Sequence, residues 1–193
     1  MFQVRIHGRG GQGVVTGAEM LSMTAFFEGR HAQAFPSFGS ERTGAPVVAF
    51  CRIADREIRL REPIVEPDCL IVQDATLFKV IDVFAGVRSD GYLLVNTNKS
   101  FDELHVSEAA VRLPKGHAVI VPATEFALKH VGRPLPNAAL LGAFAALTNF
   151  VHIDSVKRAI EEAFPGRIGA ANIAAAAEAY GFVLSQQQAT SAA

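Results

Sequence analysis

The hydrophobic positions of the chain follow two spacings, one typical of strands and one typical of helices. Strands are predicted where apolar residues alternate or run continuously over a few positions, at residues 2–7, 31–35, 46–53, 69–73, 92–96 and 118–121. Helices are predicted where the pattern is helical, at residues 14–28, 76–84, 124–131, 137–150, 153–164 and 170–182. Because the two kinds of segment alternate, we expect an α/β fold with a mostly parallel sheet covered on both faces.

Two regions depart from this simple alternation. Residues 46–53 and 57–60 flank the turn Ala54-Asp55-Arg56, which predicts a β-hairpin. The pattern is helical from Asn137 onward, and the polar end, residues 185–193, is predicted to fray. The expectation is a three-layer α/β/α fold with a Rossmann-like first βαβ unit, one hairpin and a helical C-terminal third, forming one domain over residues 1–184.

A glycine-rich loop joins the first predicted strand to the first predicted helix. Its sequence, Gly8-Arg9-Gly10-Gly11-Gln12-Gly13, fits the spacing Gly-x-Gly-x-x-Gly. Backbone N–H groups and the helix dipole favour an anion at such a turn, which makes five residues candidates for cofactor binding: Gly8, Gly10, Gly11, Gln12 and Gly13. The alternative is that the glycines only let the strand and the helix pack closely and supply positive φ angles.

The residues around this loop fit a nucleotide site incompletely. A nicotinamide or flavin site needs an acidic residue after the second strand, which here ends in Pro36-Ser37-Phe38, and Glu28 lies in the last turn of the preceding helix. A P-loop needs Lys followed by Ser or Thr after its last glycine, where this chain has Val14-Val15. A stand-alone dinucleotide-binding oxidoreductase therefore stays an alternative prediction.

A second polar loop, residues 36–46, follows the second predicted strand. It holds the remaining candidate cofactor-binding residues: Ser40, Glu41, Arg42, Thr43 and Gly44. Arg42 has the donor geometry for a carboxylate or a phosphate, with Glu41 fixing it in place, and an ordinary ion pair within the loop is the alternative. Both loops are predicted at the carboxyl ends of adjacent strands, where open α/β sheets bind ligands.

Composition and charge exclude several functions. The net charge of -1 gives no electrostatic basis for binding nucleic acid or an anionic membrane. Cys51 and Cys69 are too few for a four-thiolate iron–sulfur cluster and are predicted to be reduced, buried and inert, and the histidines lack zinc-ligand spacing. Since no nucleophile elbow occurs either, the sequence assigns no catalytic residue and no metal ligand to this chain.

Two further features concern location and assembly. The chain shows no leading signal segment and no apolar run near 18 residues, which predicts a cytoplasmic protein without a membrane partner. Charged residues make up only 19% of the chain, a low share for a free monomer. We therefore expect other subunits to cover part of the surface.

Several segments together resemble the gamma subunit of the 2-oxoacid:ferredoxin oxidoreductases, the pyruvate synthase group. They are the glycine loop, Pro36-Ser37-Phe38-Gly39-Ser40-Glu41-Arg42-Thr43-Gly44-Ala45-Pro46, Asn137-Ala138-Ala139-Leu140-Leu141-Gly142, Ala163-Phe164, Asn172-Ile173-Ala174-Ala175 and Tyr180-Gly181. They span almost the whole chain in order, and Phe-Gly-Ser-Glu-Arg is the narrowest of these signals. Thr43 departs from the family pattern, which usually has Arg or Gly there, so a second cationic contact at this position is in doubt.

The resemblance implies a non-catalytic subunit of a large complex. Enzymes of this family decarboxylate a 2-oxoacid on thiamine diphosphate, pass electrons through iron–sulfur clusters and hand the acyl group to coenzyme A. Thiamine diphosphate, Mg²⁺ and [4Fe–4S] clusters are expected on alpha, beta and delta partner subunits, with an electron acceptor protein or a flavin subunit beyond them. This chain is expected to complete the assembly, and contact with coenzyme A through the glycine loop and Arg42 is the further expectation.

Overall fold

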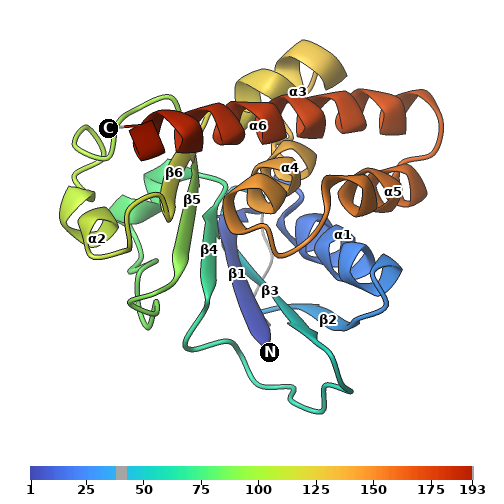
Figure 1. The fold of residues 1–193 in the computed structure, drawn as a ribbon, viewed down its shortest axis with the longest axis horizontal. Helices are drawn as coiled ribbons and strands as arrows, with labels where there is room; N and C mark the ends of the chain where they lie inside the picture. The colour runs from blue at the N-terminus through green and yellow to red at the C-terminus, as the bar shows by residue number, and fades with distance from the viewer. Residues whose placement is uncertain (38–42, 193) are drawn as a thin grey trace.

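The computed structural model describes residues 1–37 and 43–192 and shows a sheet with helices on both sides (Figure 1). The six strands lie in the order β2-β3-β1-β4-β5-β6, which puts the first strand inside the sheet. They are β1 (Phe2–Arg9), β2 (His31–Pro36), β3 (Pro46–Ala54), β4 (Cys69–Val72), β5 (Tyr92–Asn96) and β6 (Ala118–Val121).

Most of the sheet is parallel, as predicted. β4 pairs in parallel with β1 and β5, and β6 with β5, whereas β3 runs antiparallel to both of its neighbours, β1 and β2. β1 and β2 thus share one direction, but β3 lies between them. Because β1, β4, β5 and β6 are parallel, their carboxyl ends meet at one edge of the sheet.

Helices cover both faces of the sheet unequally. They are α1 (Val14–Phe27), the 3₁₀ segment η1 (Ala75–Lys79), α2 (Ser107–Val111), α3 (Ala123–Val131), α4 (Asn137–Thr148), α5 (Ile153–Ala163) and α6 (Arg167–Ala192). On one face, α1, α4 and α6 contact the strands, and α3 and α5 pack against these helices, all within one large apolar cluster. The other face carries a smaller cluster, which includes Leu77 of η1 and Ala110 of α2. The three-layer α/β/α prediction is therefore confirmed.

The predicted hairpin between residues 46–53 and 57–60 is wrong. Residues 57–60 form no strand, and β3 instead forms a hairpin with β2, which precedes it in the chain. Both edges of β3 are already paired, one with β1 and one with β2, so no edge is left for residues 57–60.

The predicted helix over residues 76–84 is also wrong, because only η1 forms there. The Asp74 side chain accepts a hydrogen bond from the Thr76 N–H at 3.0 Å and caps the segment. Asp82 accepts from the Phe84 N–H at 3.1 Å, a local turn that competes with helical hydrogen bonding. The short helix α2 was not predicted, since its five residues are too few to show a helical period.

The tail from residue 185 was predicted to fray, and in the structure α6 continues to Ala192. Val183 is fully buried, and the Gln186 side chain donates to the Ile120 carbonyl on the edge strand β6 at 3.1 Å. These contacts tie the last turns of α6 to the sheet.

The same helix is long and apolar enough over residues 167–190 to cross a membrane by length and composition alone. Its packing explains that composition. A Cβ on Gly142 of α4 would lie 2.0 Å from the Ala176 carbonyl of α6, so the two helix backbones are in direct contact. This close approach is typical of a core helix.

Both cysteines are free and fully buried, as predicted. Cys51 of β3 and Cys69 of β4 each pair with Val4 of β1, from opposite sides. A whole strand therefore separates the two thiols. Burial raises the pKa of both thiols far above the usual value, which makes them poor nucleophiles.

Candidate functional site

The two polar loops predicted from the sequence meet at the carboxyl end of β1. The Gly10 N–H donates to the Ala45 carbonyl at 2.9 Å, and the Gly44 N–H donates to the Gly10 carbonyl at 3.1 Å. Gly10 also forms a parallel bridge with Thr43. The loops were expected to meet because the strands before them, β1 and β2, were predicted to be adjacent. In the structure, β3 lies between β1 and β2. Residues 43–45 reach the glycine loop because they lead into β3, which pairs with β1.

The candidate residues of this site divide into two groups. Gly8, Gly10, Gly11, Gln12 and Gly13 lie together with Thr43 and Gly44 at this edge of the sheet. Ser40, Glu41 and Arg42 lie outside the described residues.

The glycines of the loop have two structural roles: some adopt positive φ angles, and one allows the strand and the helix to pack closely. Gly11 and Gly13 have φ angles of 93° and 71°, which side-chain-bearing residues rarely adopt. A Cβ on Gly8 would lie 2.5 Å from Cγ2 of Val14, so strand and helix pack closely here, as the packing interpretation requires. Gly13 is the N-cap of α1, and no described side chain accepts a hydrogen bond from the first N–H groups of this helix. These N–H groups and the positive end of the helix dipole therefore favour an anion here.

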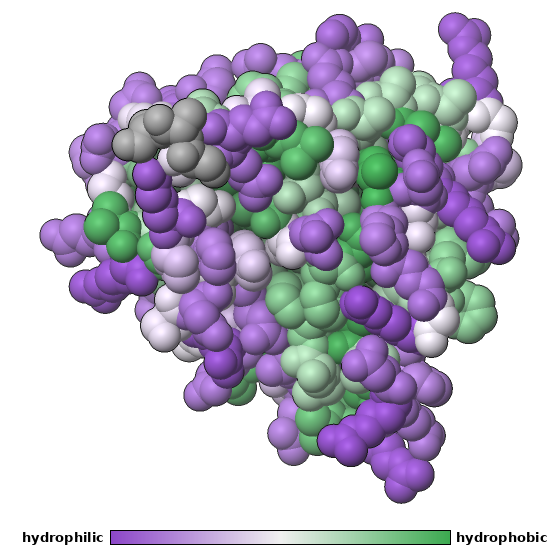
Figure 2. All heavy atoms as spheres, in the orientation of Figure 1, coloured by the Kyte–Doolittle hydropathy of each residue, from purple (hydrophilic) through white to green (hydrophobic). Residues whose placement is uncertain are grey.

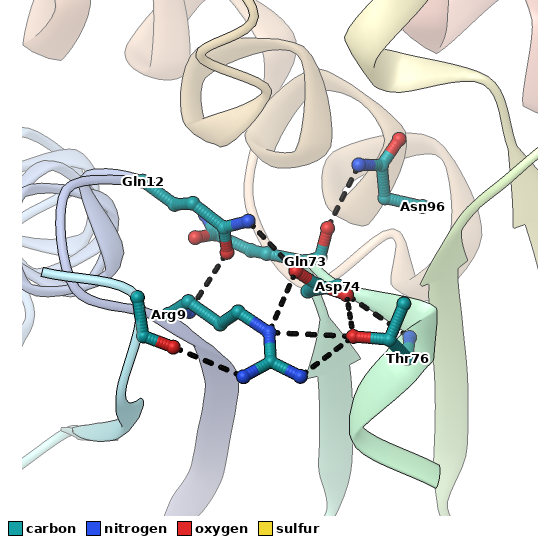
Figure 3. A network of polar contacts seen from close by, with 7 residues as sticks. Arg9, Gln12, Gln73, Asp74, Thr76 and Asn96 are labelled. Carbon is teal, nitrogen blue, oxygen red and sulfur yellow. Dashed lines mark hydrogen bonds and ion pairs between the residues drawn. The ribbon is translucent and has the colours of Figure 1, made fainter. Parts of the chain in front are cut away.

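Arg9 joins three segments at this edge (Figure 3). Its Nε donates to Oδ2 of Asp74 at 3.1 Å, its Nη2 to Oγ1 of Thr76 at 2.7 Å, and its Nη1 to the Gly44 carbonyl at 3.0 Å. The guanidinium thus connects the glycine loop to the end of β4, to η1 and to the second polar loop.

Gln12 folds back over the loop that contains it. Its Oε1 accepts from the Arg9 N–H at 2.7 Å, and its Nε2 donates to Oδ2 of Asp74 at 2.9 Å. Asp74 therefore receives Arg9, Gln12 and Thr76 at once. Partial burial raises the pKa of Asp74, but the hydrogen bonds from Thr76 and Gln12 and the charge of Arg9 outweigh burial and hold that pKa below the usual value.

Two carboxamides, those of Asn96 and Asn137, continue the polar edge towards β5, α3 and α4. Asn96 donates to the Gln73 carbonyl and to Oγ1 of Thr124, both at 2.8 Å, and accepts from the Thr124 N–H at 3.0 Å. Asn137 is the first residue of α4, and the cap position before it is Pro136. Asn137 accepts from the Ala138 N–H at 3.0 Å and lies against Gly13, where a Cβ would be 2.6 Å from its Nδ2.

The sequence interpretation did not assign Gln73, Asp74 or Asn96 to the site. A signal was available, since each follows or ends an apolar run predicted as a parallel strand. Polar residues at such strand ends lie at the ligand edge of an open sheet. What the sequence cannot show is that Asp74 lies opposite Arg9, because that pairing joins residues 65 positions apart.

The other groups that could bind a ligand or a metal ion lie away from the glycine-loop edge. Glu28 lies away from the glycine loop. Its Oε1 accepts a hydrogen bond from the His152 N–H at 2.7 Å, at the start of α5. Within the described ranges, His, Cys, Asp and Glu form no group of three that could hold a metal ion. A cavity of about 820 Å³ lies between the segment after η1 and α2, lined by Asp82, His105 and Arg112 among others and by none of the predicted site residues.

The fold and the polar edge define the class: an α/β subunit with a Rossmann-like strand-to-helix turn at the ligand edge of its sheet. The chain belongs to the pyruvate ferredoxin/flavodoxin oxidoreductase family, whose model matches residues 3–182. It is a gamma-type subunit of a 2-oxoacid:ferredoxin oxidoreductase complex, which confirms the resemblance drawn from the sequence motifs.

Curated relatives support this membership over nearly the full chain. The chain is 49% identical over 180 residues to the pyruvate/ketoisovalerate oxidoreductases common subunit gamma of Pyrococcus abyssi, covering 93% of this chain and 96% of that protein. It is also 49% identical over 180 residues to the pyruvate synthase subunit PorC of Methanothermobacter marburgensis, with the same coverage.

Solved structures agree in fold. The pyruvate oxidoreductase subunit PORC of Thermotoga maritima is 35% identical, with a TM-score of 0.78 over 93% of this chain and 95% of that one. The 2-oxoglutarate:ferredoxin oxidoreductase of Magnetococcus marinus shares the fold at 16% identity, with a TM-score of 0.66, and there the match covers 97% of this chain but 31% of the other. The same fold therefore occurs as part of a longer polypeptide.

Proposed function

We propose that this subunit supports oxidative decarboxylation of a 2-oxoacid to acyl-coenzyme A and CO₂ without holding the reaction centre itself. In this proposal, thiamine diphosphate, Mg²⁺ and [4Fe–4S] clusters belong to alpha, beta and delta partners, and a further protein or flavin subunit accepts the electrons. The observation that carries the proposal is the 49% identity, over 93% of the chain, to a gamma subunit common to pyruvate and ketoisovalerate oxidoreductases. A subunit shared by two enzymes also supports assigning the choice of 2-oxoacid to other chains.

The exposed surface supports a role within an assembly. Large apolar side chains that are at least 47% exposed occur on several elements: Met1, Phe26, Leu60, Val65, Val80, Val111, Leu128 and Ile168. Figure 2 shows green apolar areas interrupting the polar surface on one face of the molecule. Apolar surface of this kind is covered in many multi-subunit proteins.

Within the complex, we assign to the glycine-loop edge a contact with the pyrophosphate of coenzyme A. The residues fit such a group. Among the described residues, no atom lies within 4 Å of where a Cβ on Gly11 would be, and none of their side chains caps α1 at Gly13. Gly10, Gly11 and Gly13 would present the loop backbone to the phosphates, and Arg42 would add a bidentate cation. When bound, coenzyme A supplies the thiol that accepts the acyl group.

The test is an Arg42→Ala variant of the intact complex, assembled by co-expression with its partner subunits. We expect the KM for coenzyme A to rise about tenfold, because charge-assisted hydrogen bonds to phosphate are strong, and the kcat to stay unchanged. The matched control is Arg59→Ala, which removes an exposed arginine whose ion pair in the described part of the chain is with Glu57. An unchanged KM in Arg42→Ala would contradict the contact with coenzyme A.

A second experiment tests the subunit role. The chain purified alone should oxidise no 2-oxoacid, and it should co-purify with the other subunits when they are expressed together. Titration of the chain alone with NAD(H), NADP(H) and flavin should show no tight binding. Tight binding of one of them would favour the alternative, a stand-alone dinucleotide-binding oxidoreductase.

A further inference from the structure

Asp74 is the residue at which the contacts of the glycine-loop edge converge, and it lies outside every motif of the sequence. We propose that Asp74 is a positioning residue for acyl transfer, whose carboxylate orients Arg9 and Gln12 and thereby sets the edge that receives coenzyme A. This inference rests on the proposed contact with coenzyme A and names a residue through which that contact is controlled. Asp74 need not touch the ligand, because it acts through its two partners.

The geometry gives Asp74 control over both polar loops. Oδ2 accepts from Arg9 at 3.1 Å and from Gln12 at 2.9 Å, whereas Oδ1 accepts from the Thr76 backbone at 3.0 Å and hydroxyl at 2.6 Å. The guanidinium of Arg9, held by Oδ2, donates with its far side to the Gly44 carbonyl at 3.0 Å. Gly44 belongs to the second polar loop, so the Arg9 side chain couples Asp74 to the described part of that loop, residues 43–45.

The two carboxylate oxygens of Asp74 therefore have separate tasks. Oδ1 caps η1, a structural role, and Oδ2 holds the glycine-loop side chains. The Asp74 side chain is 16% exposed and that of Arg9 is 27% exposed, so solvent screens this pair less than a surface pair. The negative charge also balances Arg9 next to the start of α1, where an unpaired cation would otherwise change the affinity for anions.

This division of tasks makes Asp74→Asn a sharp probe. The amide oxygen can still accept from the Thr76 backbone and hydroxyl and so keep the cap of η1. The amide nitrogen, however, would face Arg9 and Gln12, both of which are donors in this structure. The variant thus removes the positioning contact while leaving the structural one.

The experiment measures steady-state kinetics of the assembled complex with coenzyme A as the varied substrate. We expect Asp74→Asn to raise the KM for coenzyme A about tenfold at unchanged kcat, a split that a general loss of folding would not produce. In the double variant Arg9→Ala/Asp74→Asn, the rise should be smaller than the product of the rises in the two single variants, because Asp74 acts on the ligand partly through Arg9. The matched controls are Arg88→Ala and Asp90→Asn, which break a pair of similar length, 3.0 Å, next to the amino end of β5.

The outcomes separate this inference from the proposed function. If Arg42→Ala raises the KM and Asp74→Asn leaves it unchanged or lowers it, Asp74 does not position the edge and the inference fails. If neither variant changes the KM, the contact with coenzyme A itself fails. If Asp74→Asn does not assemble, Thr76→Val takes its place, since it removes the hydroxyl that accepts from Arg9 at 2.7 Å and should raise the KM several-fold.

Discussion

The two faces of the sheet are built from the same strands but bury their side chains in different ways. On the helical face, β1 contributes Val4 and Ile6 to a large apolar cluster. On the opposite face, the alternate residues of the same strand are Arg5 and His7, which are 8% and 5% exposed. The helical face is stabilised by apolar burial throughout. The opposite face has a smaller apolar cluster over β4 and β5, and at β1 it depends on how well its buried polar groups are bonded.

Arg5 shows how the opposite face is closed without long helices. Its Nη1 donates to the carbonyls of Ile64 and Val65, both at 3.3 Å, and its Nη2 donates to those of Val83 and Ala85, at 3.0 and 2.5 Å. These carbonyls belong to two segments outside the named helices and strands. A single buried guanidinium thus anchors both segments to β1, a task that apolar contacts perform on the helical face.

The largest expected effect tests the helical face. Phe144 of α4 is fully buried and packs edge-on against Phe2, with ring centroids 6.2 Å apart. We expect Phe144→Ala to lower the free energy of unfolding by about 4 kcal/mol, because it leaves a cavity in a close-packed cluster. Urea unfolding of the purified chain measures the change. Phe26→Ala is the control, since Phe26 is 71% exposed and should change stability by less than about 0.5 kcal/mol. Equal losses in the two variants would mean that the helical face does not depend on packing.

The next effect tests the opposite face. Arg5→Met preserves much of the aliphatic bulk and removes all donors to the four carbonyls, so we expect a loss of about 3 kcal/mol in the free energy of unfolding. Limited proteolysis of the same variant should show faster cleavage within residues 60–67, because these residues lose their anchor. Arg59→Met is the matched control, because the Arg59 side chain is 86% exposed. If Arg5→Met is as stable as the control, the guanidinium does not hold this face together.

The same contrast explains what the sequence could predict. The strands and most helices of the helical face follow from periodicity, because apolar burial imposes a regular spacing on β1, α1 and α5. Apart from β4, the segment over residues 55–91 was predicted poorly, with a hairpin and a helix that do not form. This segment is held in part by hydrogen bonds from Arg5 and Arg52 to its backbone carbonyls. Any residue has a backbone carbonyl, so such bonds leave no pattern in the sequence of the segment that accepts them.

The candidate site divides in the same way. The glycine loop and residues 43–44 could be placed at the ligand edge from motifs and from the rule that strand ends meet there. Asp74 could not be recognised as their common partner, since its role comes from a contact with Arg9 that depends on the parallel register of β1 and β4. Site residues that belong to a local motif can be recognised in the sequence. Site residues that meet only through the register of two strands, such as Arg9 and Asp74, are recognised only in the structure.

The smallest expected effect concerns His7 on the opposite face. Neither ring nitrogen of His7 has a hydrogen-bond partner in the part of the chain that the structure describes. Burial, with a smaller contribution from the charge of Arg5, lowers the pKa of His7 from 6.5 to about 4. The unfolded chain therefore binds a proton at His7 near pH 6.5, whereas the folded chain binds it only near pH 4, so stability falls as the pH drops between these values.

Between pH 7 and pH 5, this difference corresponds to a loss of about 2 kcal/mol in the free energy of unfolding. The carboxyl groups whose pKa is lowered, such as Asp74 and Glu178, lose their contribution only below their ordinary values, at more acidic pH. Urea unfolding of His7→Leu at both pH values should therefore show the decline removed, since the variant has no group to protonate. In His31→Gln, which changes an exposed histidine, the decline should remain. A decline of equal size in His7→Leu would show that the opposite face tolerates a charged imidazole, and that burial on that face is less complete than on the helical one.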